Sequence, residues 1–127
     1  MTQNSSPQEY TVTRDGDRDL EFAGVELGAG SFGTGGTSGF ARDWTRGTNV
    51  TIYRTAGGRY VVGVKQWSAW EGEGDVHRAA VCETPADVLA WLIEDAGGQL
   101  GHASKEALEA AAAEDAGIAG ILTERIE

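Results

Sequence analysis

The period of the apolar residues changes once along the chain, between Cys82 and Thr84, and this change restricts the fold more than any other feature. After it, apolar residues recur at helical spacing, as Val88, Leu89 and Leu92 do. Before it, apolar and polar residues alternate, as in strands with one buried face, in five segments: 9–15, 20–27, 49–56, 59–67 and 76–82. Consecutive strands followed by helices are typical of an α+β fold.

Short turn sequences join most of the predicted strands, and they decide how the strands pair. The turn signals are "DGD" at 15–17, Gly57-Gly58 and "EGEGD" at 71–75. Short connections of this kind join antiparallel neighbours. Because 127 residues suffice for one core, we predict a single domain over 9–127 with an antiparallel meander of about five strands. Gly24 predicts a β-bulge in the second strand.

Two to three C-terminal helices are predicted to pack on one face of this sheet. Thr84 is a good N-cap and Pro85 suits the first helical position, so the first helix begins there and ends at Gly97-Gly98. Ser104 is predicted to cap a second helix over 105–116. A short third helix is predicted over 118–126.

Two segments are predicted to lie outside the regular structure. Residues 1–8 are polar and are predicted to be a flexible N-terminal tail. Residues 28–39 contain six glycines among twelve residues, which predicts a glycine-rich mobile loop because glycine loses much entropy on ordering. Its G-x-G-x-x-G spacing matches a nucleotide-binding motif, but a helix does not follow the glycines. We therefore predict that this segment binds no phosphate.

The negative charge is concentrated in the C-terminal third of the chain. The net charge is −10, and residues 83–127 carry ten Asp or Glu against only Lys105 and Arg125. Such a surface repels nucleic acid and anionic membranes and attracts basic proteins. We expect a partner protein with a basic surface and neither direct nucleic-acid nor membrane binding. A solubilising coat without a partner is an open alternative.

Metal, cofactor and catalytic motifs are not recognised in the sequence. His77, Cys82 and His102 are too far apart in the sequence, and too different in context, to predict a metal site. A catalytic Ser/His/Asp set and a cofactor motif are not found either. Cys82 is the single cysteine and is predicted to be a small buried apolar residue. This cysteine content and the polar N-terminus predict a cytoplasmic protein.

Two kinds of residue are candidates for contact with a partner. Trp44 and Trp70 lie in predicted connections near polar segments, and large aromatics often anchor interfaces. The other candidates are carboxylates predicted to lie on exposed helix surface: Glu94, Asp95, Glu106, Glu109, Glu114 and Asp115.

Three segments resemble a known family. "YTVTRDGDRDLEFAG" (10–24), "IYRTAGGRYVV" (52–62) and "AAVCETPADVLAWL" (79–92) are similar to small uncharacterised proteins of GC-rich actinobacteria and their plasmids and phages. The resemblance implies a stand-alone accessory protein, of the kind that a mobile element carries. It implies no catalytic residue. The insert at 28–39 departs from the family pattern.

Three hypotheses for function follow. The first is a non-enzymatic acidic protein-binding module that covers a basic surface of a partner. Its finer form is a mobile-element inhibitor, such as an anti-CRISPR or another counter-defence protein that mimics DNA. The second is a small-ligand or peptide-binding module, in which the glycine-rich loop is a lid over an aromatic sheet face. The third is an enzyme of unrecognised type.

Overall fold

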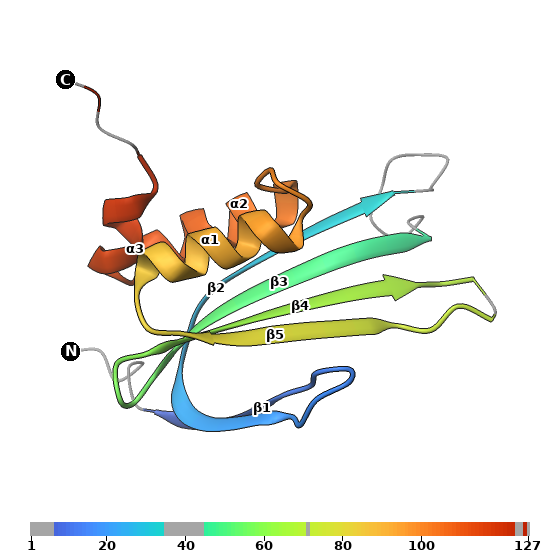
Figure 1. The fold of residues 1–127 in the computed structure, drawn as a ribbon, viewed down its shortest axis with the longest axis horizontal. Helices are drawn as coiled ribbons and strands as arrows, with labels where there is room; N and C mark the ends of the chain where they lie inside the picture. The colour runs from blue at the N-terminus through green and yellow to red at the C-terminus, as the bar shows by residue number, and fades with distance from the viewer. Residues whose placement is uncertain (1–6, 35–44, 71, 124–125, 127) are drawn as a thin grey trace.

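Five strands lie in the sheet in the order in which they follow one another along the chain (Figure 1). The computed structural model describes residues 7–34, 45–70, 72–123 and 126. Every neighbouring pair of strands is antiparallel, which confirms the predicted α+β meander. The strands are β1 (Gln8–Val12), β2 (Leu20–Thr34), β3 (Arg46–Thr55), β4 (Tyr60–Ser68) and β5 (Val76–Cys82).

The predicted glycine-rich loop is wrong for residues 28–34, which continue strand β2. They pair with β3 as far as Thr34 opposite Arg46. Residues 35–39 of the predicted loop lie outside the described part of the chain. The predicted bulge at Gly24 is also misplaced, because the register shifts between Glu26 and Gly28.

Helix packing explains why glycines occupy this part of β2. A Cβ added to Gly30 would lie 2.1 Å from the Ala103 carbonyl oxygen, and one added to Gly28 would lie 2.5 Å from the Ala111 nitrogen. Both neighbouring atoms belong to the backbone of a helix. Glycine is therefore required at these positions for close approach between helix and sheet.

Three helices follow the sheet, α1 (Pro85–Asp95), α2 (His102–Ala112) and α3 (Ala116–Ile121). The predicted start of α1 is confirmed, since the Thr84 hydroxyl oxygen accepts a hydrogen bond from the Asp87 nitrogen at 3.1 Å. The predicted start of α2 is wrong. Gly101 is its N-cap, and Ser104 is buried inside the helix. A small buried residue such as Ser104 lets α2 lie close to the sheet. Because serine is also a common N-cap residue, the sequence alone suggested a helix start at this position.

The helices cover one face of the sheet, and the main core lies between the two layers (Figure 1). Side chains at alternate positions of β3 and β4 point toward the helices, among them Ile52 and Val62, which are fully buried. The helices contribute Val88, Leu92 and Leu108 to the same cluster.

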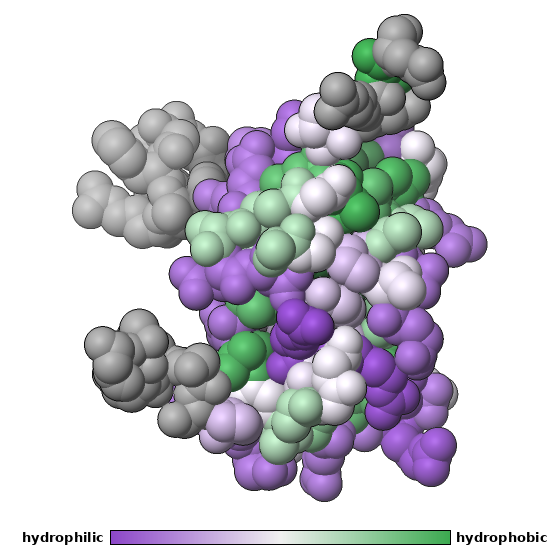
Figure 2. All heavy atoms as spheres, turned by 90° about the vertical axis from the view of Figure 1, so that its left-hand side faces the viewer, coloured by the Kyte–Doolittle hydropathy of each residue, from purple (hydrophilic) through white to green (hydrophobic). Residues whose placement is uncertain are grey.

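The end of the molecule at which α3 lies shows a patch of apolar surface surrounded by hydrophilic residues (Figure 2).

On its other side the sheet curls over itself, because β1 and the start of β2 fold away from the helices (Figure 1). Val12 of β1 thereby reaches Gly63 of β4, where an added Cβ would lie 3.1 Å from Val12 Cγ1. The turn after β1 also reaches β5. The Asp15 nitrogen donates to the His77 carbonyl at 2.9 Å, and the His77 nitrogen donates to Asp15 Oδ2 at 2.9 Å. The sheet is thus a curled half-barrel.

The N-terminal end of the described chain bears on the predicted tail. Strand β1 begins at Gln8, inside the predicted tail, and residues 1–6 of that tail lie outside the described part. None of the helices in the described residues is long and apolar enough to cross a membrane.

Candidate functional site

Asp115 is not on the exposed surface as predicted but is buried, with 5% of the residue exposed. Its carboxylate accepts hydrogen bonds from Tyr60 Oη at 3.1 Å, from Arg54 Nη1 at 3.0 Å and from the Ile118 nitrogen at 3.0 Å. The last of these makes Asp115 the N-cap of α3. Burial, and then the Asp115 charge, raise the pKa of Tyr60, so its hydroxyl stays a donor. Asp115 therefore holds α3 against the sheet, and its buried carboxylate is not part of the exposed acidic surface.

Asp95 is also withdrawn from the predicted acidic surface. Arg78 of β5 binds it through two hydrogen bonds, one of them from Nη2 to Oδ2 at 3.0 Å. Only 13% of the Asp95 side chain is exposed. The pair joins the end of α1 to the sheet, because Arg78 points to the helix face. The Asp95 carboxylate thus has Arg78 as a structural partner within the chain.

The other four predicted carboxylates are exposed: Glu94, Glu106, Glu109 and Glu114. Glu106 also has a structural role, since the Ser31 nitrogen donates to its Oε1 at 2.8 Å. Among the described residues of 83–127, Lys105 is the single lysine or arginine. The exposed helix surface therefore keeps its negative charge.

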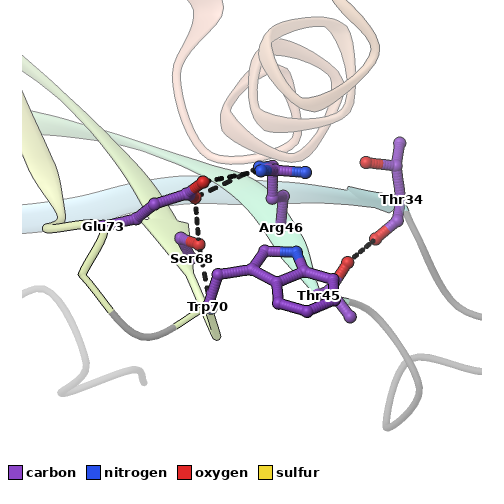
Figure 3. Close-up of polar contacts among 6 residues, drawn as sticks. All are labelled: Thr34, Thr45, Arg46, Ser68, Trp70 and Glu73. Atoms are coloured by element: carbon purple, nitrogen blue, oxygen red, sulfur yellow. Dashed lines mark hydrogen bonds and ion pairs between the residues drawn. The ribbon is translucent and has the colours of Figure 1, made fainter.

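Trp70 lies beyond the end of β4 with 53% of the residue exposed (Figure 3). Its backbone nitrogen donates to Ser68 Oγ at 3.1 Å. Ser68 in turn hydrogen-bonds Glu73, and Arg46 Nη2 pairs with Glu73 Oε2 at 2.7 Å. These hydrogen bonds from Arg46 and Ser68 lower the pKa of Glu73, which therefore stays charged at neutral pH. The backbone of Trp70 is thus held by Ser68 while its indole is exposed. The other candidate, Trp44, lies outside the described residues.

An aromatic cluster that the sequence analysis missed lies on the sheet face opposite the helices. Tyr10, Phe22 and Tyr53 pack together with ring centroids 4.9–5.6 Å apart, the first two stacked and Tyr53 tilted or edge-on to them. The alternation in the sequence placed Tyr10 and Phe22 on strand faces, but it could not show that the sheet curls and brings them to Tyr53. This cluster is the aromatic part of that sheet face.

A cavity of about 250 Å³ between the helices and the sheet brings together Asp95, His102 and Ser104. Nucleophilic catalysis needs a hydrogen bond between the nucleophile and its base. Among the described residues, His102 and Ser104 form no such bond with each other, and Arg78 occupies both Asp95 oxygens. This geometry assigns no catalytic role to the three side chains.

Cys82 is buried in the main core, as predicted. Burial raises the pKa of its thiol to about 11, so the reactive thiolate is scarce at neutral pH. Within the part of the chain that the structure describes, three or more His, Cys, Asp or Glu side chains nowhere gather in a geometry that could hold a metal ion.

Comparison of the chain with protein-family models, curated protein sequences and solved structures finds no match. The resemblance to small actinobacterial proteins therefore stays a prediction.

Proposed function

We propose that this chain is a non-enzymatic protein-binding module that covers a basic surface of a partner protein. Two features would make the contact, the exposed carboxylates of the helix layer and the indole of Trp70. The carboxylates provide attraction and orientation, and the indole provides an apolar anchor.

The observation that carries this proposal is a contrast among the acidic residues. Asp95 and Asp115 pair with arginines and hold helices on the sheet. Among the described residues, Glu94, Glu109 and Glu114 have no basic group within 4.0 Å. Their carboxylates are exposed and form no ion pair among the described residues, which leaves them available to a partner.

Replacing Glu94, Glu109 and Glu114 together by glutamine is expected to weaken partner binding and to reduce its dependence on salt. The free energy of unfolding should stay within about 0.5 kcal/mol of the wild type, because exposed substitutions rarely change it more. The partner is first isolated by affinity capture from the source cells. Its purified form is then titrated against each variant at several salt concentrations.

The matched control replaces Glu9, Glu21 and Glu26, which are exposed on β1 and β2, by glutamine. Both triple variants lose the same charge, so a general electrostatic attraction weakens equally in the two. The proposal requires the helix variant to lose more affinity than the strand variant. Equal affinity in all three proteins would mean that the helix charges are a solubilising coat.

Trp70→Ala is expected to weaken the same partner's binding at least tenfold, the loss typical of a buried interface anchor. The fold should be nearly unaffected, because the side chain is more than half exposed and only its backbone joins the Ser68 network. Calorimetric titration measures the affinity and thermal unfolding checks the fold. Trp67→Phe, on β4, is a control for the loss of one indole. Unchanged affinity in Trp70→Ala would remove the aromatic anchor from the proposed interface.

The finer hypothesis, an inhibitor that mimics DNA, remains part of the proposal only for a nucleic-acid-binding partner. In that case the chain and a DNA duplex should compete for the same partner surface. Competition by a labelled duplex separates this form from a general acidic binding module. Simultaneous binding of both would exclude the mimic while leaving the broader proposal in place.

A further inference from the structure

A second cavity, of about 270 Å³, lies inside the curl of the sheet, on the face away from the helices. Strands β3, β4 and β5 provide its floor, and the end of β1 provides one wall. Its size is just below the range of about 300–1,000 Å³ that holds drug-sized ligands. The space therefore suits a small molecule.

The strand register explains why this space is open. Thr51 and Ala79 lie on either side of Gly63 in the sheet, so one row across the floor carries only small side chains. Val12 closes over Gly63, where any Cβ would be in tight contact with it. A larger residue at position 63 would fill the space from below.

Polar groups lie at one end of this cavity and an aromatic ring at the other. Asn49, Lys65 and His77 are direct partners across three strands and form one row. Tyr53 lines the opposite end, where its ring packs against Tyr10 and edge-on to Phe22. Burial, together with the Glu26 charge, raises the pKa of Tyr53, so its hydroxyl stays a hydrogen-bond donor.

The ionisable side chains that line the cavity are basic or neutral, in a chain with a net charge of −10. Lys65 Nζ lies 3.7 Å from Asp75 Oδ2, and His77 Nδ1 lies 3.6 Å from Asp15 Oδ1. Both distances exceed those of hydrogen bonds, so neither Lys65 nor the His77 ring is held by its carboxylate through a hydrogen bond. Arg78 is turned away and binds Asp95 on the other face.

We propose that this cavity binds a small organic anion with a ring, its ring against Val12, Gly63 and Tyr53 and its anionic group at Lys65 and His77. The site lies on the face of the sheet opposite the acidic helices, so it goes beyond the proposed protein contact. Lys65 supplies the charge-assisted hydrogen bond, and Asn49 supplies a neutral amide beside it.

The probes for this site are benzoate, indole-3-carboxylate and phenyl phosphate, with benzamide as the neutral counterpart of benzoate. Each is titrated into the isotope-labelled full chain, and amide chemical shifts are followed by NMR. At least one anion is expected to shift the amides of Thr51, Gly63 and His77 in a saturable way. Benzamide should bind more weakly than benzoate. Absence of saturable shifts at these amides with all three anions would overturn the proposal.

Two substitutions with opposite expected effects on anion affinity then test the role of Lys65. Lys65→Met should weaken binding of the anion about tenfold, since it removes one charge-assisted hydrogen bond, and should leave benzamide unchanged. Asp75→Asn should strengthen anion binding, because it removes the carboxylate that competes for Lys65. The Lys65 and Asp75 side chains are 47% and 40% exposed and lie outside the main core, so both variants are expected to fold. Anion affinity that is the same in wild type and both variants would contradict the site.

Discussion

Asp115→Ala is expected to lower the free energy of unfolding by about 3 kcal/mol. The substitution leaves the buried Tyr60 hydroxyl without its acceptor, which costs about 1–3 kcal/mol. It also removes the N-cap of α3, a loss of about 1 kcal/mol. Arg54 adds little, because its side chain is 48% exposed and water replaces the lost carboxylate.

Denaturant unfolding monitored by circular dichroism measures this loss. Glu114→Ala is the matched control, since the neighbouring side chain is exposed, and should change the free energy of unfolding by less than about 0.5 kcal/mol. Asp115→Asn keeps an acceptor for the cap and for Tyr60, so its loss should lie between the two. Equal stability of Asp115→Ala and Glu114→Ala would show that the Tyr60 and Ile118 contacts do not stabilise α3.

The sequence predicts the parts of the fold that local interactions decide. The five strands were predictable because each carries its own alternation and most are bounded by turn signals. The start of α1 was predictable because Thr84 and Pro85 act within one turn of the helix. In these cases the interacting residues are neighbours in the chain, so their physical role can be recognised before the fold is known.

Contacts between distant segments explain what the sequence did not predict. An exposed aspartate and a buried one look alike until their partners are known. Arg54 and Tyr60 are about sixty residues from Asp115 in the chain, and Arg78 is seventeen from Asp95. The curl that brings Val12 to Gly63 across two intervening strands leaves no local signal either.

The candidate sites also differ in whether local sequence or contacts between distant segments create them. Trp70 was predicted near the surface because polar and glycine residues follow it, and it is exposed. The cavity inside the curl was not predicted, because Asn49, Lys65 and His77 meet only through the register of three strands. Alternation alone assigns these residues to one face of the sheet, but only the curl encloses the space above them.

Gly30→Ala is expected to lower the free energy of unfolding by about 3 kcal/mol, at the upper end of the usual cost of overpacking. The new Cβ would lie 2.1 Å from the Ala103 carbonyl oxygen and 2.7 Å from the Ala107 nitrogen. Both are backbone atoms of α2, so relief requires the whole helix to move away from β2. That movement would also lengthen the hydrogen bond from the Ser31 nitrogen to Glu106.

Gly120→Ala is the matched control for the same chemical change. Gly120 lies in α3, where nothing would come within 4 Å of a new Cβ, and alanine there should stabilise the chain by about 0.5–1 kcal/mol. The two substitutions are thus expected to change stability in opposite directions, as measured by denaturant unfolding. Had 28–34 been a loop, Gly30→Ala would be neutral or slightly stabilising, since alanine restricts the unfolded chain. A neutral Gly30→Ala would therefore contradict the packing of α2 on β2, because no flexible side chain at this contact can yield.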